Sequence, residues 1–296
     1  MKILLIGHGY VGAYLRGRLC QQPAMDLWTI DSQPDRVQNV PRSISTRYQD
    51  LGTEFIQQFD AILWFAGHSS VKTCAADPLG AVRNNCSDLI EFVGKKADRT
   101  KFIYASSASV YSEIASGYGT PKRFEEAEAM AAPETTYDAS KVAFDSLVSV
   151  VGKNSVGLRM GTVSGWSSCL RPELIFNAMN ISAMTDEVVW VSNPAAARTI
   201  LFLDDLYFYV KALLASSAEM PGILNLGSLN LRIGELAEFI AGFHAVSLKE
   251  VKTGPTYSFN MSLELAGARY GFPEKPSLEC RCKQFVEDYL NEGNRN

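Results

Sequence analysis

The chain has 296 residues, enough to bury a large core, and its 47% hydrophobic and 20% charged residues are ordinary for a globular protein. Its net charge is -4 without a long basic run, so neither nucleic acid nor an anionic membrane surface is an expected partner. No apolar stretch approaches the roughly 20 residues of a membrane span, and the six cysteines lack disulfide or metal-ligand spacing, so we expect a cytoplasmic protein with reduced thiols and no metal.

A short apolar run at residues 2–6 predicts a parallel strand that is buried on both faces. It ends in a G-x-G-x-x-G motif, which opens a helical pattern. In this setting the glycines permit a tight turn and a close approach of the backbone to a pyrophosphate at the helix N-terminus. We therefore expect a dinucleotide-binding loop that includes Gly7, Gly9, Tyr10, Val11 and Gly12.

The next predicted strand, residues 27–31, ends in Asp31, which follows Gly12 by 19 residues. A carboxylate at this position binds the ribose 2′-hydroxyl of NAD and repels the 2′-phosphate of NADP. The alternative is an acid that only begins a turn. We favour NAD as the cofactor, and the nearby Arg36 leaves NADP open.

Residues 60–67 predict another buried strand, which ends on Ala66 and Gly67. His68 follows at the edge where open α/β sheets bind ligands, so it either contacts the substrate or is a loop histidine without a role. A long helix is expected from residue 78 to about residue 97. Midway along it, Asn85 is either a buried side chain that holds the helix and a proton-relay water, or a solvated amide.

The stretch from residue 101 to residue 141 carries the candidate chemistry. A strand at residues 101–105 leads to Ser107, and Tyr137 and Lys141 follow on a predicted helix, one turn apart on the same face. The pKa of a free phenol is about 10, and a nearby ammonium lowers it, which makes Tyr137 a candidate general acid and base. Ser107 would hold a substrate alcohol or carbonyl against the phenol. The loop at residues 112–136 is long enough to be functional and is expected to lie over the active site.

Strands at residues 156–163, 200–205 and 222–227 continue the alternation with helices, which predicts an α/β fold with a Rossmann-type doubly wound parallel sheet. The alternation breaks after residue 164, where a helix (171–184) and a short strand (187–191) are expected. Three helices are expected near residues 233–246, 261–270 and 278–290. We therefore expect an NAD-binding domain from residues 1–164 and 198–228, and a smaller, discontinuous α+β substrate-binding domain from residues 165–197 and 229–296.

The order and spacing of these motifs resemble the extended short-chain dehydrogenase/reductases, and within them the NAD-dependent epimerase/dehydratase family that acts on sugar nucleotides. The resemblance covers nearly the whole chain and implies that Tyr137 is the acid/base, that Lys141 lowers its pKa and binds ribose, and that Ser107 positions the substrate. It extends to further family positions, which are Asp50, Leu51, Phe65, Ala66, Gly67, Asn85, Leu158-Arg159, Arg198 seven residues before Asp205, and Asn225-Leu226-Gly227.

The resemblance also implies which residues contact the ligands. Asp50 and Leu51 would lie at the adenine, and Arg198 would bind the nucleotide diphosphate, a role that suits a guanidinium. A surface ion pair is the alternative for Arg198. Cofactor contacts are further implied for Phe65, Ala66, Gly67 and Asn85, and substrate contacts for Ser69, Ser107, Ser109, Thr162, Arg171, Asn177 and Arg198.

Departures from the family pattern narrow the reaction. The 4,6-dehydratases carry acids directly after the catalytic hydroxyl, whereas this chain has Ala108 and Ser109 there; the fucose-synthase type has a Cys at the position of Ser109 and a His in the second domain, and both are missing. Many 4-epimerases have a substrate-binding Asn where this chain has Thr162. Two reactions remain: a 4-epimerase-like reaction by transient hydride transfer at sugar C4, or a net 4-ketoreductase or dehydrogenase reaction. A non-catalytic dinucleotide sensor is a third alternative, against which Tyr137 and Lys141 argue.

A homodimer is also expected from the resemblance. The helices that begin near residues 78 and 137 would lie side by side, as in family dimers that form a four-helix bundle. Four apolar residues would either supply this interface or pack on the sheet: Leu89, Phe92, Phe144 and Leu147.

Overall fold

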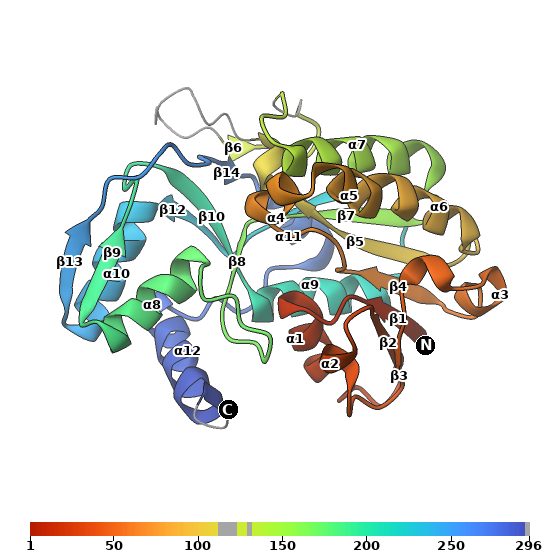
Figure 1. Ribbon diagram of the computed structural model, residues 1–296, viewed down its shortest axis with the longest axis horizontal. Helices are drawn as coiled ribbons and strands as arrows, with labels where there is room; N and C mark the ends of the chain where they lie inside the picture. The colour runs from red at the N-terminus through yellow and green to blue at the C-terminus, as the bar shows by residue number, and fades with distance from the viewer. Residues whose placement is uncertain (112–122, 129–131, 294–296) are drawn as a thin grey trace. The chain divides into compact units, whose positions relative to one another are not determined.

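The computed structural model describes residues 1–111, 123–128 and 132–293 (Figure 1). The chain forms two compact units. The first unit consists of Met1–Val110, Ala132–Arg159 and Val210–Leu224, and the second of Tyr111–Ala131, Met160–Tyr209 and Asn225–Asn296. Most of the loop expected over the active site, at residues 112–122 and 129–131, lies outside the described residues. The domain boundaries expected from the sequence stay a prediction.

A seven-stranded sheet lies at the centre of the first unit, in the order β11-β7-β5-β4-β1-β2-β3. The strand order reverses between β1 and β4, the kind of switch point at which open α/β sheets bind ligands. The sheet confirms the predicted Rossmann-type doubly wound fold. Its strands are β1 (Lys2–Ile6), β2 (Asp26–Asp31), β3 (Ser43–Ser45), β4 (Ala61–Trp64), β5 (Lys101–Ser107), β7 (Ser155–Met160) and β11 (Gly222–Leu226).

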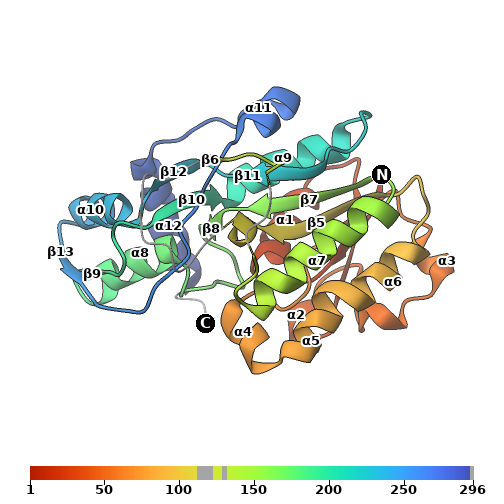
Figure 2. The same ribbon diagram turned by 90° about the horizontal axis from the view of Figure 1, so that it is seen from above.

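Both faces of this sheet are covered. Helices α4 (Val71–Ala76), α5 (Pro78–Val82), α6 (Asp88–Lys95) and α7 (Thr136–Val151) lie on one face, and α1 (Tyr10–Leu19) lies on the other (Figures 1 and 2). The apolar runs of the strands alternate between the faces, so Leu4, Ile62 and Phe102 pack in one cluster with Phe92 and Phe144 from the helices. The first unit also contains α2 (Pro34–Val37), the 3₁₀ turn η1 (Tyr48–Asp50) and α3 (Thr53–Ile56).

The long helix expected from residue 78 is interrupted. A π-helical turn, η2 (Arg83–Ser87), separates α5 from α6. Such turns interrupt the regular hydrogen bonding of an α-helix and are frequent at functional sites. Asn84 and Asn85 lie within this turn, and both direct their side chains to partners outside the helix.

The second unit contains three small sheets: β12 (Leu229–Arg232), β10 (Ala197–Phe202) and β8 (Thr162–Ser164) in one, β13 (Ser247–Glu250) with β9 (Val188–Val191), and β14 (Asn260–Met261) with β6 (Arg123–Phe124). The single strand expected at residues 156–163 is therefore divided into β7 and β8 at Gly161. A Cβ at Gly161 would stand 2.5 Å from the Thr199 carbonyl oxygen, so only glycine fits where the chain leaves one sheet for the other.

The helices of the second unit surround an apolar cluster of its own. Phe176, Phe202, Leu236, Ile240 and Phe285 are among its buried members. The helices are α8 (Ile175–Thr185), α10 (Ile233–His244), α11 (Glu264–Tyr270) and α12 (Leu278–Gly293), and α9 (Leu203–Ala215) begins in this unit and ends in the first. In the part of the chain that the structure describes, no helix is long and apolar enough to cross a membrane.

Candidate active site

The glycine loop between β1 and α1 leaves no space for a side chain at Gly7 or Gly12. Gly7 has a φ of +97°, in the region that favours glycine, and a Cβ there would stand 2.5 Å from the Ala66 amide nitrogen at the end of β4. A Cβ at Gly12 would stand 1.9 Å from the Gly7 carbonyl oxygen. Gly9 precedes α1 without a side-chain cap hydrogen bond, and the N-terminus of this helix carries the partial positive charge that favours an anion. The loop thus fits the pyrophosphate of a dinucleotide.

Asp31 ties the end of β2 to this loop. Its side chain accepts hydrogen bonds from the main-chain amides of His8 (2.7 Å) and Gln33 (2.9 Å). The Arg36 guanidinium lies 3.7 Å from Asp31 Oδ2 and 3.5 Å from the position that a Gly9 Cβ would take. A carboxylate and a guanidinium therefore stand together at the ribose end of the expected cofactor site.

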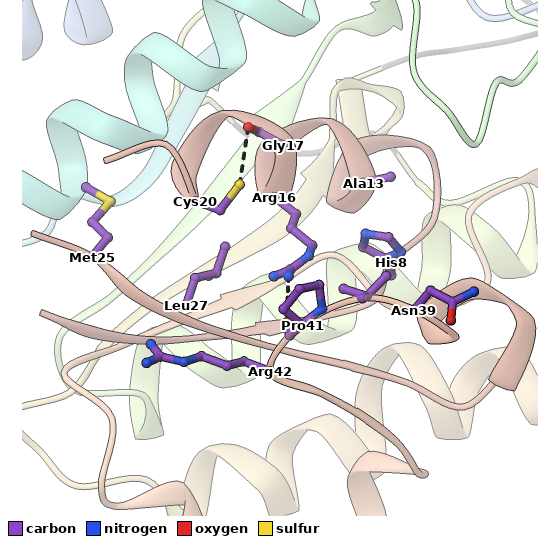
Figure 3. Close-up of a pocket in the computed structure, with 11 residues that line it drawn as sticks. His8, Ala13, Arg16, Gly17, Cys20, Met25, Leu27, Asn39, Pro41 and Arg42 are labelled. Carbon is purple, nitrogen blue, oxygen red and sulfur yellow. Dashed lines mark hydrogen bonds between the residues drawn. The ribbon is translucent and has the colours of Figure 1, made fainter. Parts of the chain in front are cut away.

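A cavity of about 500 Å³ lies beside α1 (Figure 3). Arg16 reaches across it from α1, and its two terminal nitrogens donate to Thr29 Oγ1 (3.0 Å) and to the Pro41 carbonyl (2.6 Å). Burial lowers the pKa of His8, another lining residue, whose Nδ1 lies 2.6 Å from the Arg36 carbonyl oxygen. None of the sequence-predicted site residues lines this cavity, so we do not assign the active site to it.

The candidate catalytic residues meet where β5 ends beside α7. Lys141 Nζ donates to the Ala105 carbonyl (3.0 Å), two residues before Ser107, and lies 5.8 Å from the centre of the Tyr137 ring. Burial lowers the pKa of Lys141, while the charge of Asp145 opposes this effect. Ser107 Oγ accepts a hydrogen bond from the Ser109 amide (3.2 Å) and lies 2.9 Å from Ser109 Oγ. The Tyr-Lys pair thus shares one helix face, as its spacing predicts.

Asn85 connects the end of β4 to α7. Its Oδ1 accepts from the His68 amide (2.9 Å), and its Nδ2 donates to the His68 carbonyl (3.0 Å) and to Ser140 Oγ (3.1 Å). Ser140 in turn donates to the Tyr137 carbonyl (2.8 Å). Gly67 has a φ of +134°, and a Cβ there would stand 2.5 Å from Asn85 Oδ1. Of the alternatives considered for Asn85, the structure has the buried side chain that holds its surroundings in place.

The His68 ring is held by polar neighbours. Its Nδ1 lies 3.3 Å from Asn84 Nδ2, and its Nε2 lies 3.8 Å from Asp77 Oδ2. Asn84 Oδ1 also accepts a hydrogen bond from the Tyr48 hydroxyl (2.8 Å). Of the remaining predicted residues nearby, Ser69 is exposed, as is Asp50 at the end of η1, while Leu51 packs in the core of the first unit.

A buried polar cluster that the sequence did not predict lies directly under the catalytic strand. Asp145 is 3% exposed and accepts hydrogen bonds of 3.0 Å from the Tyr104 hydroxyl, from Ser106 Oγ and from Arg159 Nε. Burial and the charge of Asp145 raise the pKa of Tyr104 well above its usual value, so this phenol remains a donor. The only sequence signal was the spacing of four residues between Lys141 and Asp145.

Of the predicted substrate residues of the second unit, Arg198 and Asn177 are buried, and Thr162 and Arg171 are partly buried. Arg198 is 5% exposed; its Nη2 donates to Thr256 Oγ1 (2.9 Å), and its guanidinium lies 5.1 Å from the centre of the Phe259 ring. Arg198 is therefore an interior residue, and the alternative of a surface ion pair does not fit its position. Thr162 begins β8, whose neighbour β10 carries Arg198.

Asn177 is fully buried, and its amide holds two main-chain groups. Its Oδ1 accepts from the Gly165 amide (3.0 Å), and its Nδ2 donates to the Arg171 carbonyl (3.0 Å). The Arg171 side chain forms an ion pair with Glu173 (2.8 Å). Among the described residues, no group of three or more His, Cys, Asp and Glu side chains could hold a metal ion.

Comparison with known proteins gives one family. The model of the NAD dependent epimerase/dehydratase family matches residues 3–227. No curated protein matches the chain.

Solved structures share the fold over the whole length. UDP-glucuronic acid 4-epimerase from Bacillus cereus, solved with a fluorinated UDP-sugar and NAD, is 18% identical, with a TM-score of 0.82 and coverage of 99% of this chain and 100% of that one. UDP-glucose 4-epimerase from Thermotoga maritima is 16% identical, with a TM-score of 0.82 and 99% coverage of both chains. A dTDP-glucose 4,6-dehydratase from Bacillus anthracis is 17% identical, with a TM-score of 0.81 and coverage of 99% and 98%. At these identities the likeness establishes the fold.

Proposed function

The chain belongs to the NAD dependent epimerase/dehydratase family, and we propose that it is a 4-epimerase-like enzyme that acts on a sugar nucleotide. The observation that carries the proposal is the pair of Tyr137 and Lys141 on α7, with Lys141 Nζ bonded to the Ala105 carbonyl at the end of β5. In this arrangement an ammonium stands beside a phenol at the ligand-binding edge of the sheet.

The proposed chemistry needs one acid/base. The Lys141 ammonium favours the phenolate form of Tyr137, which takes the proton of the sugar C4 hydroxyl and later returns it. Ser107 holds the same oxygen. NAD, when bound, accepts the C4 hydride and later donates it back. If the 4-keto sugar rotates in the site so that the hydride returns to its opposite face, the sugar is epimerised at C4.

The remaining roles are assigned by position. The amides after Gly9 would bind the pyrophosphate, Asp31 would bind the ribose hydroxyls, and Lys141 would bind the nicotinamide ribose. Arg198 would bind the nucleotide diphosphate, because a guanidinium offers paired donors to phosphate oxygens. Further contacts are proposed for Asp50, Leu51, Phe65, Ala66, Gly67 and Asn85 to the cofactor, and for Ser69, Ser109, Thr162, Arg171 and Asn177 to the substrate.

A net 4-ketoreductase or dehydrogenase is the second candidate. The observation that favours it is Arg36, whose guanidinium stands 3.7 Å from Asp31, where it could pair with the 2′-phosphate of NADP. Such an enzyme would exchange its nicotinamide with solution in every turnover. A non-catalytic dinucleotide sensor would need neither Tyr137 nor Lys141.

The deciding experiment is turnover with a panel of UDP-, dTDP-, CDP- and GDP-sugars, followed by absorbance of the reduced nicotinamide and by chromatography of the sugar. We expect a C4 epimer without a net change in absorbance, and NAD that stays with the purified protein. A stoichiometric absorbance change would establish the reductase instead. Tyr137→Phe is the control, and turnover that survives this change would contradict the proposed acid/base.

We also propose that the chain forms a homodimer through α5 and α7. Leu89, Phe92 and Phe144, which were candidates for the interface, are buried in the core of the first unit. The interface would instead be formed by the exposed apolar side chains of these two helices, which are Leu79, Val82, Leu147, Val150 and Val151. Sedimentation is expected to show twice the chain mass of 32.5 kDa, and Val150→Glu is expected to give the monomer. A wild-type protein that stays monomeric at micromolar concentration would reject the dimer.

A further inference from the structure

One carboxylate holds the strand that ends at Ser107. Along β5, Tyr104 and Ser106 point to the same side, and both donate to Asp145, one to each of its oxygens. Between them, the Ala105 carbonyl accepts from Lys141 Nζ. Asp145 and Lys141 are one turn apart on α7. The three consecutive residues before Ser107 are therefore all bonded to this one face of α7.

The same carboxylate is the counter-charge of two cations. Arg159 on β7 donates to Asp145 Oδ2 at 3.0 Å, and both side chains are at least 95% buried. Lys141 is partly buried, and burial alone disfavours its charged form. The structure thus places one buried anion beside two cations, Arg159 and Lys141.

The other titratable groups near Lys141 do not replace this charge. Tyr137 lies on the same helix, and Cys74 faces Lys141 from α4. Burial raises the pKa of Cys74, so its thiol is neutral at physiological pH. Asp138, which interacts with Cys74, accepts a hydrogen bond from the Thr135 hydroxyl at the start of α7.

We propose that Asp145 is a positioning residue, which holds Lys141 in its ammonium form and keeps β5 in register with α7. The proposal rests on the proposed function, because the Lys141 charge matters to catalysis only if Tyr137 is the acid/base. Asp145 itself does not touch the reacting atoms. Asp145 affects catalysis through the charge of Lys141. It also holds Ser106, and thereby fixes the position of the adjacent Ser107.

A charge role and a purely structural role predict opposite changes when Asp145 becomes Asn. Loss of the anion lowers the pKa of Lys141, and an opposite charge within about 4–6 Å is worth about one to three pH units. Loosened packing would instead admit water to Lys141 and raise its pKa toward the free value. The direction of the change therefore separates the two roles.

The experiment is an NMR titration of Lys141 in protein that contains isotope-labelled lysine, without substrate, with the signal assigned by Lys141→Met. For Asp145→Asn we expect a pKa about one to three units below that of the wild type. Asp145→Glu should restore it, because the charge is kept. Tyr104→Phe is the matched control: it removes a hydrogen bond to Asp145, keeps the charge, and should leave the pKa of Lys141 unchanged.

A second variant covers the case in which Asp145→Asn does not fold, since it leaves Arg159 buried without its partner. Asp145→Leu combined with Arg159→Met replaces the pair by apolar side chains, a change that proteins often tolerate. It should lower the pKa of Lys141 in the same way. A pKa that is unchanged or raised in whichever of these variants folds would overturn the proposal. A protein that turns over no sugar nucleotide yet shows the lowered pKa would refute the proposed function and not this inference.

Discussion

Replacement of Asn85 by Ala tests how much the hydrogen bonds from the π-helical turn to the end of β4 stabilise the protein. Asn85 makes three hydrogen bonds, two with the main chain of His68 and one with Ser140. Each contributes about 1 kcal/mol, and a buried main-chain group left without a partner costs about 1–3 kcal/mol more. His68 is only partly buried, so water can replace part of the loss. We expect the free energy of unfolding to fall by about 2–4 kcal/mol.

Equilibrium unfolding in urea measures this loss, and Asn84→Ala is the matched control from the same turn. Asn84 accepts one hydrogen bond from the Tyr48 hydroxyl and contacts the His68 ring, so its loss should cost about 1 kcal/mol. The Asn85 variant should also turn over substrate more slowly, because Ser140 no longer links this turn to the Tyr137 carbonyl. Equal losses for both variants, or a loss below about 0.5 kcal/mol for Asn85→Ala, would refute the reasoning.

Three further changes test the cofactor end and the pH dependence. Gly12→Ala should abolish NAD binding measured by calorimetry, because its Cβ would overlap the Gly7 carbonyl oxygen at 1.9 Å. Arg36→Ala should lower the affinity for NADP relative to NAD by about tenfold or more, since a charged hydrogen bond to a phosphate is worth about 1.5–3 kcal/mol; an unchanged ratio would remove Arg36 from the site. Burial lowers the pKa of His8 and of His244, so both stay neutral in the folded state while the unfolded chain takes up protons below about pH 6.5. Stability should therefore fall as the pH drops through this value, and replacing both residues by Asn should flatten that part of the curve.

The sequence predicted the sheet where apolar runs are long enough to be buried on both faces. Residues 2–6 are such a run, and β1 covers them. The strand β3 has only the residues Ser-Ile-Ser and carries no periodic signal, so only its pairing with β2 defines it. The interruption of the helix at η2 could not be predicted either, because Asn84 and Asn85 do not break the apolar spacing of the helix. The partners of their side chains, which are Tyr48, His68 and Ser140, are distant in the sequence.

The candidate site was predictable where its residues are close in the sequence. The spacing of Tyr137 and Lys141 already places them on one helix face, whereas the setting of Lys141 depends on contacts across the fold. Asp145 is four residues from Lys141, but Tyr104 and Arg159 approach it from two different strands. A buried carboxylate of this kind is found only when the sheet and the helix are seen together.

The positions of the acids favour hydride transfer at one carbon over dehydration. Dehydration needs a second acid/base to remove a proton at C5, but Ala108 and Ser109 follow Ser107, and both are buried. Among the described residues around Tyr137, the buried Asp145 carboxylate accepts hydrogen bonds from Tyr104, Ser106 and Arg159. One oxygen of the buried Asp138 carboxylate accepts from the Thr135 hydroxyl. Turnover in deuterated water should therefore give a sugar without carbon-bound deuterium, since the hydride taken from C4 is the one returned. Mass spectrometry of the product decides this, and deuterium at C5 would show that a second acid/base acts in the site.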